Sequence, residues 1–200
     1  MSQDIAEPPD LSPGPRDLSP DPWSAGGCAA HPVIVPRTIK EWRRGPHLIS
    51  TDWGLLDFDV VHGFLREAYW SRGIPRATVE RAARHSLPFG LYLDPSGGDR
   101  PSENGAQQIG PQQIGYARVL TDYVGIAYLM DVFVLEPHRG QGLARWLVDT
   151  MLAYPDFRDV RAWLLRSRDA AGVYERSGFE PLVDGQHYRR YSRHRGYGRG

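Results

Sequence analysis

Apolar residues recur every three or four positions in four stretches of the chain, which is the spacing of a helix that buries one face. In the first stretch, Asp57 or Asp59 stands near the start as a candidate cap. Pro75 precedes the second, where proline is tolerated because its missing N–H would have no partner in a first turn. The fourth closes at Gly178, a residue that readily takes the left-handed conformation of a helix end. The pattern predicts helices at about 60–68, 79–87, 143–151 and 170–178.

Between these helices lie runs of apolar, β-branched and aromatic residues that are typical of buried strands. Their order with the helices predicts an antiparallel meander of three strands, followed by a strand-helix-strand crossover. The fold class is therefore α/β of the α+β type, a mixed and mostly antiparallel sheet flanked by about four helices. The predicted strands are 89–93, 113–122, 124–135 and 160–165, with shorter candidates at 33–35, 180–183 and 187–192.

Three stretches lack the apolar residues needed to offset the entropy of ordering a chain. They predict a disordered proline-rich extension over 1–46, a flexible loop over 94–113 and an arginine-, tyrosine- and glycine-rich tail over 186–200. One folded domain is expected over 47–185, because 200 residues with 40% hydrophobic content can bury one sizeable core.

The charge balance and the single cysteine narrow the class of protein. Lysine plus arginine and aspartate plus glutamate each total 24, so no overall field attracts nucleic acid or an anionic membrane. The arginine-rich tail is either a frayed end or, as an alternative, a segment that contacts RNA weakly. Cys28 has no partner for an internal disulfide, and neither a long apolar span nor a secretory leader is present. We expect a cytoplasmic protein without a membrane partner.

The segment HRGQGLARWL, residues 138–147, enters a helical pattern through glycines. The start of a helix exposes unpaired N–H groups and a positive dipole end, and glycines let an anion approach them, so a pyrophosphate site is predicted. A dinucleotide fingerprint would need glycine at Arg145, and a P-loop would need Gly-Lys-Ser or Gly-Lys-Thr, so both are excluded.

The pattern that does match is R-x-x-G-x-A at Arg139, Gly142 and Ala144, preceded by V-x-V at Val132 and Val134. It resembles the coenzyme-A-binding segment of the GNAT superfamily of acyl-CoA-dependent N-acetyltransferases.

A second segment, WLLRSRDAAGVYERSGFEPL at 163–182, resembles the other signature of that superfamily, a helix that carries a tyrosine and ends in Gly-Phe. The similarity covers about 48–183, and this region also resembles a small, little-characterised bacterial branch of the superfamily. The resemblance implies the GNAT fold, with a cleft where two strands splay apart, and acetyl-CoA as cosubstrate.

The resemblance also implies which residues hold acetyl-CoA. The backbone of the splayed strand would pair with pantetheine and offer one N–H to the thioester carbonyl, while the glycine turn would wrap the pyrophosphate through main-chain N–H groups. Arg168 stands where many relatives carry an asparagine that touches the cofactor, and an arginine at this place could reach a phosphate instead. The implied set is Val132, Phe133, Val134, Arg139, Gly140, Gln141, Gly142, Leu143, Ala144 and Arg168.

Tyr174 and Asp131 are the implied catalytic residues. Tyr174 would donate a hydrogen bond or a proton to the departing sulfur, although a core tyrosine would fit the same helix. Asp131 falls near the place of a catalytic glutamate in relatives, and a carboxylate inside an apolar run is costly unless bonded or functional. It is either the base that takes the proton of the amine or a structural carboxylate. The acceptor would lie near Glu67, Tyr69, Trp70 and Arg72.

No histidine spacing matches a metal site, so we predict no metal. The G-x-S-x-G turn of a hydrolase is also absent from the sequence, so a hydrolase nucleophile has no support. The sequence therefore predicts an N-acetyltransferase that moves an acetyl group from acetyl-CoA to a small-molecule or peptide amine by direct attack in a ternary complex. An acyl-CoA-binding regulatory module without efficient catalysis is the alternative. The sequence does not decide the oligomeric state, and a homodimer is one possibility.

Overall fold

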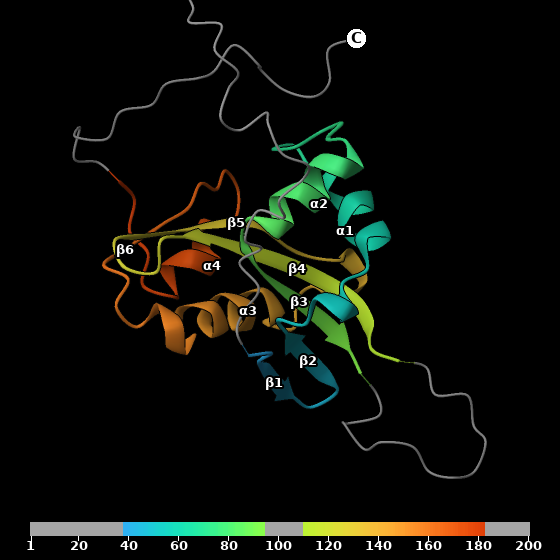
Figure 1. Ribbon diagram of the computed structural model, residues 1–200, viewed down its shortest axis with the longest axis horizontal. Helices are drawn as coiled ribbons and strands as arrows, with labels where there is room; N and C mark the ends of the chain where they lie inside the picture. The colour runs from blue at the N-terminus through green and yellow to red at the C-terminus, as the bar shows by residue number, and fades with distance from the viewer. Residues whose placement is uncertain (1–37, 95–109, 183–200) are drawn as a thin grey trace, which may run out of the picture. The chain divides into compact units, whose positions relative to one another are not determined.

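The computed structural model describes residues 38–94 and 110–182, in which six strands form one sheet with strand order β1-β2-β3-β4-β5-β6 (Figure 1). Neighbouring strands are antiparallel up to β5, and β6 is parallel to β5. This is the mixed, mostly antiparallel sheet that the sequence predicts. The strands are β1 (Glu41–Arg44), β2 (His47–Ser50), β3 (Leu87–Leu93), β4 (Gln112–Thr121), β5 (Ile126–Val134) and β6 (Ala162–Leu164).

The helices cover both faces of the sheet. Helices α1 (Phe58–Leu65) and α2 (Arg76–Arg84) lie on one face, where their buried residues pack on Tyr116 and Phe133. Helices α3 (Leu143–Leu152) and α4 (Ala171–Glu175) lie on the other face, over the larger core. Three short 3₁₀ turns, Trp53–Leu55, Glu136–His138 and Pro155–Phe157, connect these elements.

The expected helices and the strands from β3 to β6 are confirmed, and Asp57 is the cap of α1 through hydrogen bonds from Asp59 N and Val60 N. The hairpin of β1 and β2 was not predicted. Because β1 lies inside the stretch 1–46, the prediction that this whole stretch is disordered is wrong for its last residues.

The physical reason is the composition of β1, whose sequence EWRR is polar and mostly exposed. An edge strand of this kind has no alternating apolar pattern, and backbone pairing to β2 across the turn at Gly45 holds it in place. The predicted strand 180–183 is also wrong as far as it can be compared, because residues 180–182 are not in a strand. The candidates 33–35 and 187–192 lie outside the described residues.

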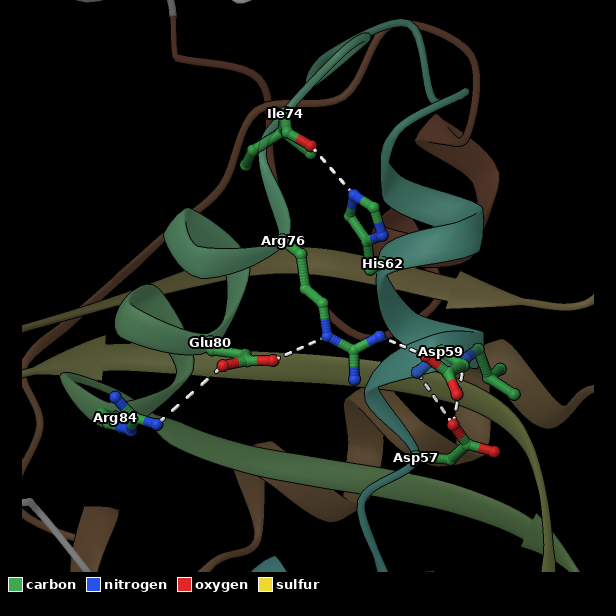
Figure 2. A network of polar contacts seen from close by, with 8 residues as sticks. Asp57, Asp59, His62, Ile74, Arg76, Glu80 and Arg84 are labelled. Carbon is green, nitrogen blue, oxygen red and sulfur yellow. Dashed lines mark hydrogen bonds and ion pairs between the residues drawn. The ribbon is translucent and has the colours of Figure 1, made fainter.

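A network of charged side chains joins α1 to α2 (Figure 2). The guanidinium of Arg76 pairs with Asp59 of α1 and with Glu80 of its own helix. His62 of α1 donates from Nε2 to the carbonyl of Ile74, at 3.1 Å, next to the start of α2. These contacts tie α1 to the end of the α1–α2 loop that leads into α2; the loop, residues 66–75, contains the predicted acceptor residues.

Strands β5 and β6 splay apart. Only Ile126, Ala127 and Tyr128 of β5 have partners in β6, whereas β5 continues to Val134. The remaining six residues of β5 have no partner strand on that side within the described part of the chain. The pairing of the two strands therefore ends where the resemblance implies that they splay apart.

Candidate active site

A β-bulge bends β5 beside the splay. The pairing of β4 and β5 shifts between Tyr116–Phe133 and Arg118–Met130, so two residues of β5, Asp131 and Val132, lie opposite a single residue of β4. Asp131 has a φ of 54°, a left-handed conformation that aspartate tolerates better than most residues. The bulge leaves the backbone from Val132 onward at the mouth of the splay.

The side chains of this part of β5 belong to the cores. Phe133 is buried and stacks on Phe64 of α1, with ring centroids 3.9 Å apart, and Val134 is buried against the opposite core. Val132 packs against that same core. Only their backbone N–H and C=O groups are candidates for cofactor contacts, as the sequence predicts.

The glycine turn leads directly into α3. Gly140 and Gly142 have φ values of 79° and 70°, and Gly142 is the N-cap without a side-chain hydrogen bond to the first turn. A Cβ at either glycine would meet no atom within 4 Å, so the backbone conformation requires glycine and the space beside it is open. Arg139 anchors the turn by donating from Nε to the carbonyl of Val134, at 3.0 Å. Leu143 is buried and Ala144 packs on the core.

Arg44 at the end of β1 reaches the same turn, and sequence analysis did not identify it. Its Nη2 donates to the carbonyl of Gln141 at 3.1 Å, and its Cζ lies 4.8 Å from the centroid of the Trp146 ring in α3. No local pattern could have indicated this contact, because the two hydrogen-bonded residues are 97 positions apart. Arg44 adds a cation to the predicted pyrophosphate turn.

Tyr174 lies in α4, with its ring centroid 6.0 Å from that of Phe179. Burial raises the pKa of the Tyr174 phenol, and Tyr69 and Asp169 raise it further. The phenol is therefore a neutral donor throughout the physiological pH range.

An open cavity of about 800 Å³ borders Tyr174 between the end of α3, β6 and α4. None of the residues from 131 to 144 lines it, so this cavity does not coincide with the predicted cofactor site at β5 and the glycine turn. The glycine turn, and not this cavity, presents the unpaired N–H groups of a helix start that an anion would bind. The apolar residues that line the cavity are Leu152, Trp163, Leu164, Leu165, Phe179 and Leu182.

The carboxylate of Asp131 is held from two sides. Its Oδ2 accepts a hydrogen bond from Arg118 Nε at 2.6 Å, and its Oδ1 accepts one from the indole Nε1 of Trp70 at 3.3 Å. The side chains of Arg118 and Asp131 are 11% and 13% exposed, so the ion pair is largely shielded from water. Trp70 thus joins the α1–α2 loop to the bulge.

Tyr69 and Arg168 meet from opposite sides of the cleft. The backbone N–H of Arg168, in the loop between β6 and α4, donates to the phenol oxygen of Tyr69 at 3.2 Å. The guanidinium Cζ of Arg168 lies 3.6 Å from the centroid of the same ring. The other two predicted acceptor residues are not part of this cluster, because Glu67 pairs with Arg66 at the surface and Arg72 is exposed.

Metal-binding groups and membrane-spanning helices can be assessed for the described residues, 38–94 and 110–182. Among them, no three histidine, cysteine, aspartate or glutamate side chains are grouped as a metal ion would require. No helix in these ranges is both long and apolar enough to cross a membrane.

Comparisons with known proteins indicate one family. Residues 104–181 match the profile of the acetyltransferase (GNAT) domain. A Gibberella zeae protein provisionally assigned as an acetyltransferase is 34% identical over 137 residues, which are 60% of this chain and 73% of the relative.

Solved structures give the same result. A crystal structure from Xanthomonas campestris, provisionally assigned to the GNAT family, has 38% identity and a TM-score of 0.62, covering 73% of this chain and 93% of its own. A Deinococcus radiodurans structure at 19% identity and TM-score 0.53 covers 76% and 94% and supports the fold alone. The relatives include a fungal and a bacterial protein, so the similarity extends beyond bacteria.

Proposed function

The chain belongs to the GNAT family of acetyltransferases, and from this premise we propose that it transfers an acetyl group from acetyl-CoA to a primary amine. The amine attacks directly, in a complex that holds both substrates. The acceptor is a small molecule or a peptide amine. The observation that carries the proposal is the glycine turn at the start of α3, which lies directly after the splayed part of β5.

The residues at this turn fit the phosphates of coenzyme A. The first N–H groups of α3 have no side-chain cap, and the space beside Gly140 and Gly142 is open. Arg44 brings a positive charge to the carbonyl of Gln141 in the same turn. Together these groups form an anion site at the positive end of a helix dipole.

The backbone of β5 supplies the second part of the site. Beyond Tyr128 the strand has no β6 partner in the described structure, so its edge can bind the amide arm of pantetheine as an added strand would. A free N–H near the bulge would donate to the carbonyl oxygen of the acetyl group.

Acetyl transfer forms a bond between the amine nitrogen and the acetyl carbon and breaks the carbon–sulfur bond of the thioester. Tyr174 donates a proton to the sulfur that leaves; the proton that the attacking nitrogen loses passes to solvent, and the phenol regains a proton from solvent. Its burial keeps the phenol neutral up to at least its ordinary pKa, so the donor is present at every physiological pH.

Substitution of Tyr174 by phenylalanine tests the proposal. We expect kcat to fall by about 10² or more, since a positioned acid contributes on the order of 10²–10⁴ in rate, while the dissociation constant for acetyl-CoA changes by less than about twofold. The measurements are thiol release with a panel of primary amines and calorimetric titration with acetyl-CoA. Tyr154→Phe is the matched control, because it also removes a buried hydroxyl but lies in the core away from α4.

A regulatory module that binds acyl-CoA is the alternative, and it shares the glycine turn. If the wild-type chain binds acetyl-CoA but no amine of the panel releases thiol above background, the transferase proposal is wrong and the module is favoured. If Gly142→Trp leaves acetyl-CoA binding unchanged, the assignment of the turn is wrong for both.

A further inference from the structure

We propose that Tyr69 is a positioning residue that holds the loop between β6 and α4, and thereby Tyr174, at the cleft. This inference rests on the function proposed above. It differs from the expectation that Tyr69 contacts the acceptor, because its nearest described partners are protein groups.

Two independent contacts join Tyr69 to this loop. The phenol oxygen accepts the backbone N–H of Arg168 at 3.2 Å, and the ring faces the Arg168 guanidinium, with Cζ 3.6 Å from its centroid. A hydrogen bond to the main chain fixes where the loop runs, whereas the cation–π contact adds attraction without fixing the backbone. The two residues are 99 positions apart and lie on opposite sides of the splay.

Helix α4 depends on such support. It has five residues, no side-chain hydrogen bond at its N-cap Ala170 and no fully buried residue, and a helix this short is unstable by itself. Its C-terminal end is tied to α3, where Ser177 Oγ donates to Asp149 Oδ1 at 2.6 Å. The Tyr69–Arg168 contacts hold the segment that leads into the other end of the helix.

Tyr69 is itself held in place through contacts that lead back to the sheet. Its ring packs edge-on against Trp70, with centroids 4.9 Å apart, and the Trp70 indole N–H donates to Asp131 at 3.3 Å. Asp131 is paired with Arg118 of β4 at 2.6 Å. A continuous series of contacts therefore runs from the bulge in β5, through the α1–α2 loop, to the loop before α4.

The functional consequence is the placement of the acid relative to the thioester. Misplacement of a reacting group by about 1 Å can cost on the order of 10² in rate. Burial is the main cause that raises the pKa of the Tyr174 phenol, and a charge interaction with Tyr69 adds to it. Removing the hydroxyl of Tyr69 should therefore loosen α4 and lower kcat without touching the acceptor.

The test compares Tyr69→Phe, which keeps the ring but removes the acceptor for the Arg168 N–H, with Tyr69→Leu, which removes both contacts. We expect kcat to fall about fivefold to tenfold in the first and further in the second, with KM for the amine unchanged within about twofold. Tyr123→Phe is the control, because it removes a tyrosine hydroxyl in the β4–β5 turn.

A second readout does not depend on turnover. Amide hydrogen exchange of residues 165–178 should become faster in both Tyr69 variants and stay unchanged in the control. In the background of Tyr174→Phe, the Tyr69→Phe change should lower kcat no further, because a residue that acts through Tyr174 has no effect once Tyr174 is lost.

Three outcomes decide the matter. A rise in KM for the amine with unchanged kcat and exchange would show that Tyr69 binds the acceptor, and the proposal would be overturned. If both Tyr69 variants keep the wild-type kcat and the wild-type rate of amide hydrogen exchange, the positioning proposal is overturned too. If Tyr174→Phe is inactive in the same experiment, the proposed function still stands. If instead Tyr174→Phe retains full activity, the assigned acid is wrong, and faster exchange alone would support only the tie to the loop.

Discussion

Asp131 combines an unusual backbone conformation with two strong side-chain contacts. Its positive φ lets β5 bulge, and its carboxylate binds the guanidinium of Arg118 and the indole of Trp70. A base that removes a proton from an amine needs an accessible oxygen, whereas the Asp131 side chain is only 13% exposed and is held in an ion pair with Arg118. Of the two roles that the sequence leaves open, this arrangement favours the structural one, in which Asp131 positions the bulge and the α1–α2 loop.

Asp131→Asn separates the two roles. Asparagine tolerates the same φ, but it leaves the Arg118 guanidinium without a charged partner in a position only 11% exposed. We expect a loss of about 1–3 kcal/mol in the free energy of unfolding, measured by urea denaturation. The dependence of kcat/KM on pH should keep its shape while its height falls.

The matched control is Asp159→Asn, because Asp159 pairs with Arg158 on the surface and its side chain is 72% exposed. This variant should leave both stability and rate near wild type. If Asp131→Asn instead removes the acidic limb of the pH profile, Asp131 is the base and the structural role is wrong.

Some of these residues could be identified from the sequence and others could not. Asp131 stands out as a carboxylate within an apolar strand, and Tyr174 through its motif, because both signals are local. The partners of Asp131 are 13 and 61 positions away, so nothing near it in the sequence predicts Arg118 or Trp70. The contact between Tyr69 and Arg168 could not be predicted for the same reason, because the two residues are 99 positions apart.

At the scale of elements, the hairpin of β1 and β2 places a cation on the start of α3. Helices and buried strands could be predicted from apolar spacing, and the cap at Asp57 from its residue type. The strand β1 could not, because an exposed edge strand is specified by backbone pairing to its neighbour and not by an apolar pattern. Because β1 was not predicted, the role of Arg44 at the end of that strand was not predicted either.

Arg44→Ala tests whether this element contributes to cofactor binding. The dissociation constant for coenzyme A should rise about fivefold, since an exposed charge interaction is worth up to about 1 kcal/mol, and the rise should shrink at high salt. Arg44→Lys keeps the charge but loses the planar contact with Trp146, so an intermediate value is expected. The measurement is calorimetric titration with coenzyme A.

Arg158→Ala is the control for Arg44, because it removes an exposed arginine that pairs with its neighbour Asp159 at the surface. Equal affinity of the Arg44→Ala variant and the wild type for coenzyme A would contradict the assignment of Arg44 to the phosphate turn.

At the scale of the whole chain, the order of the predicted helices and strands gave the fold class, and the resemblance to one family gave the splay of the two strands. The start of the folded domain was predicted less well. The sequence indicates a disordered stretch up to residue 46, whereas β1 lies at Glu41–Arg44. Trp42 of β1 packs on the larger core, 6.1 Å from the rings of Phe89 and Tyr154.

Two shortened chains test where the domain begins. A chain that starts at residue 38 keeps β1 and should match the full chain in melting temperature and in affinity for coenzyme A. A chain that starts at residue 47 loses Trp42 and Arg44 and leaves β2 as the sheet edge, so its unfolding free energy should fall by about 2 kcal/mol or more. Its affinity for coenzyme A should fall at least as much as that of Arg44→Ala. If the chain from 47 matches Arg44→Ala in affinity but keeps the full stability, then β1 contributes only its arginine and the domain begins at β2.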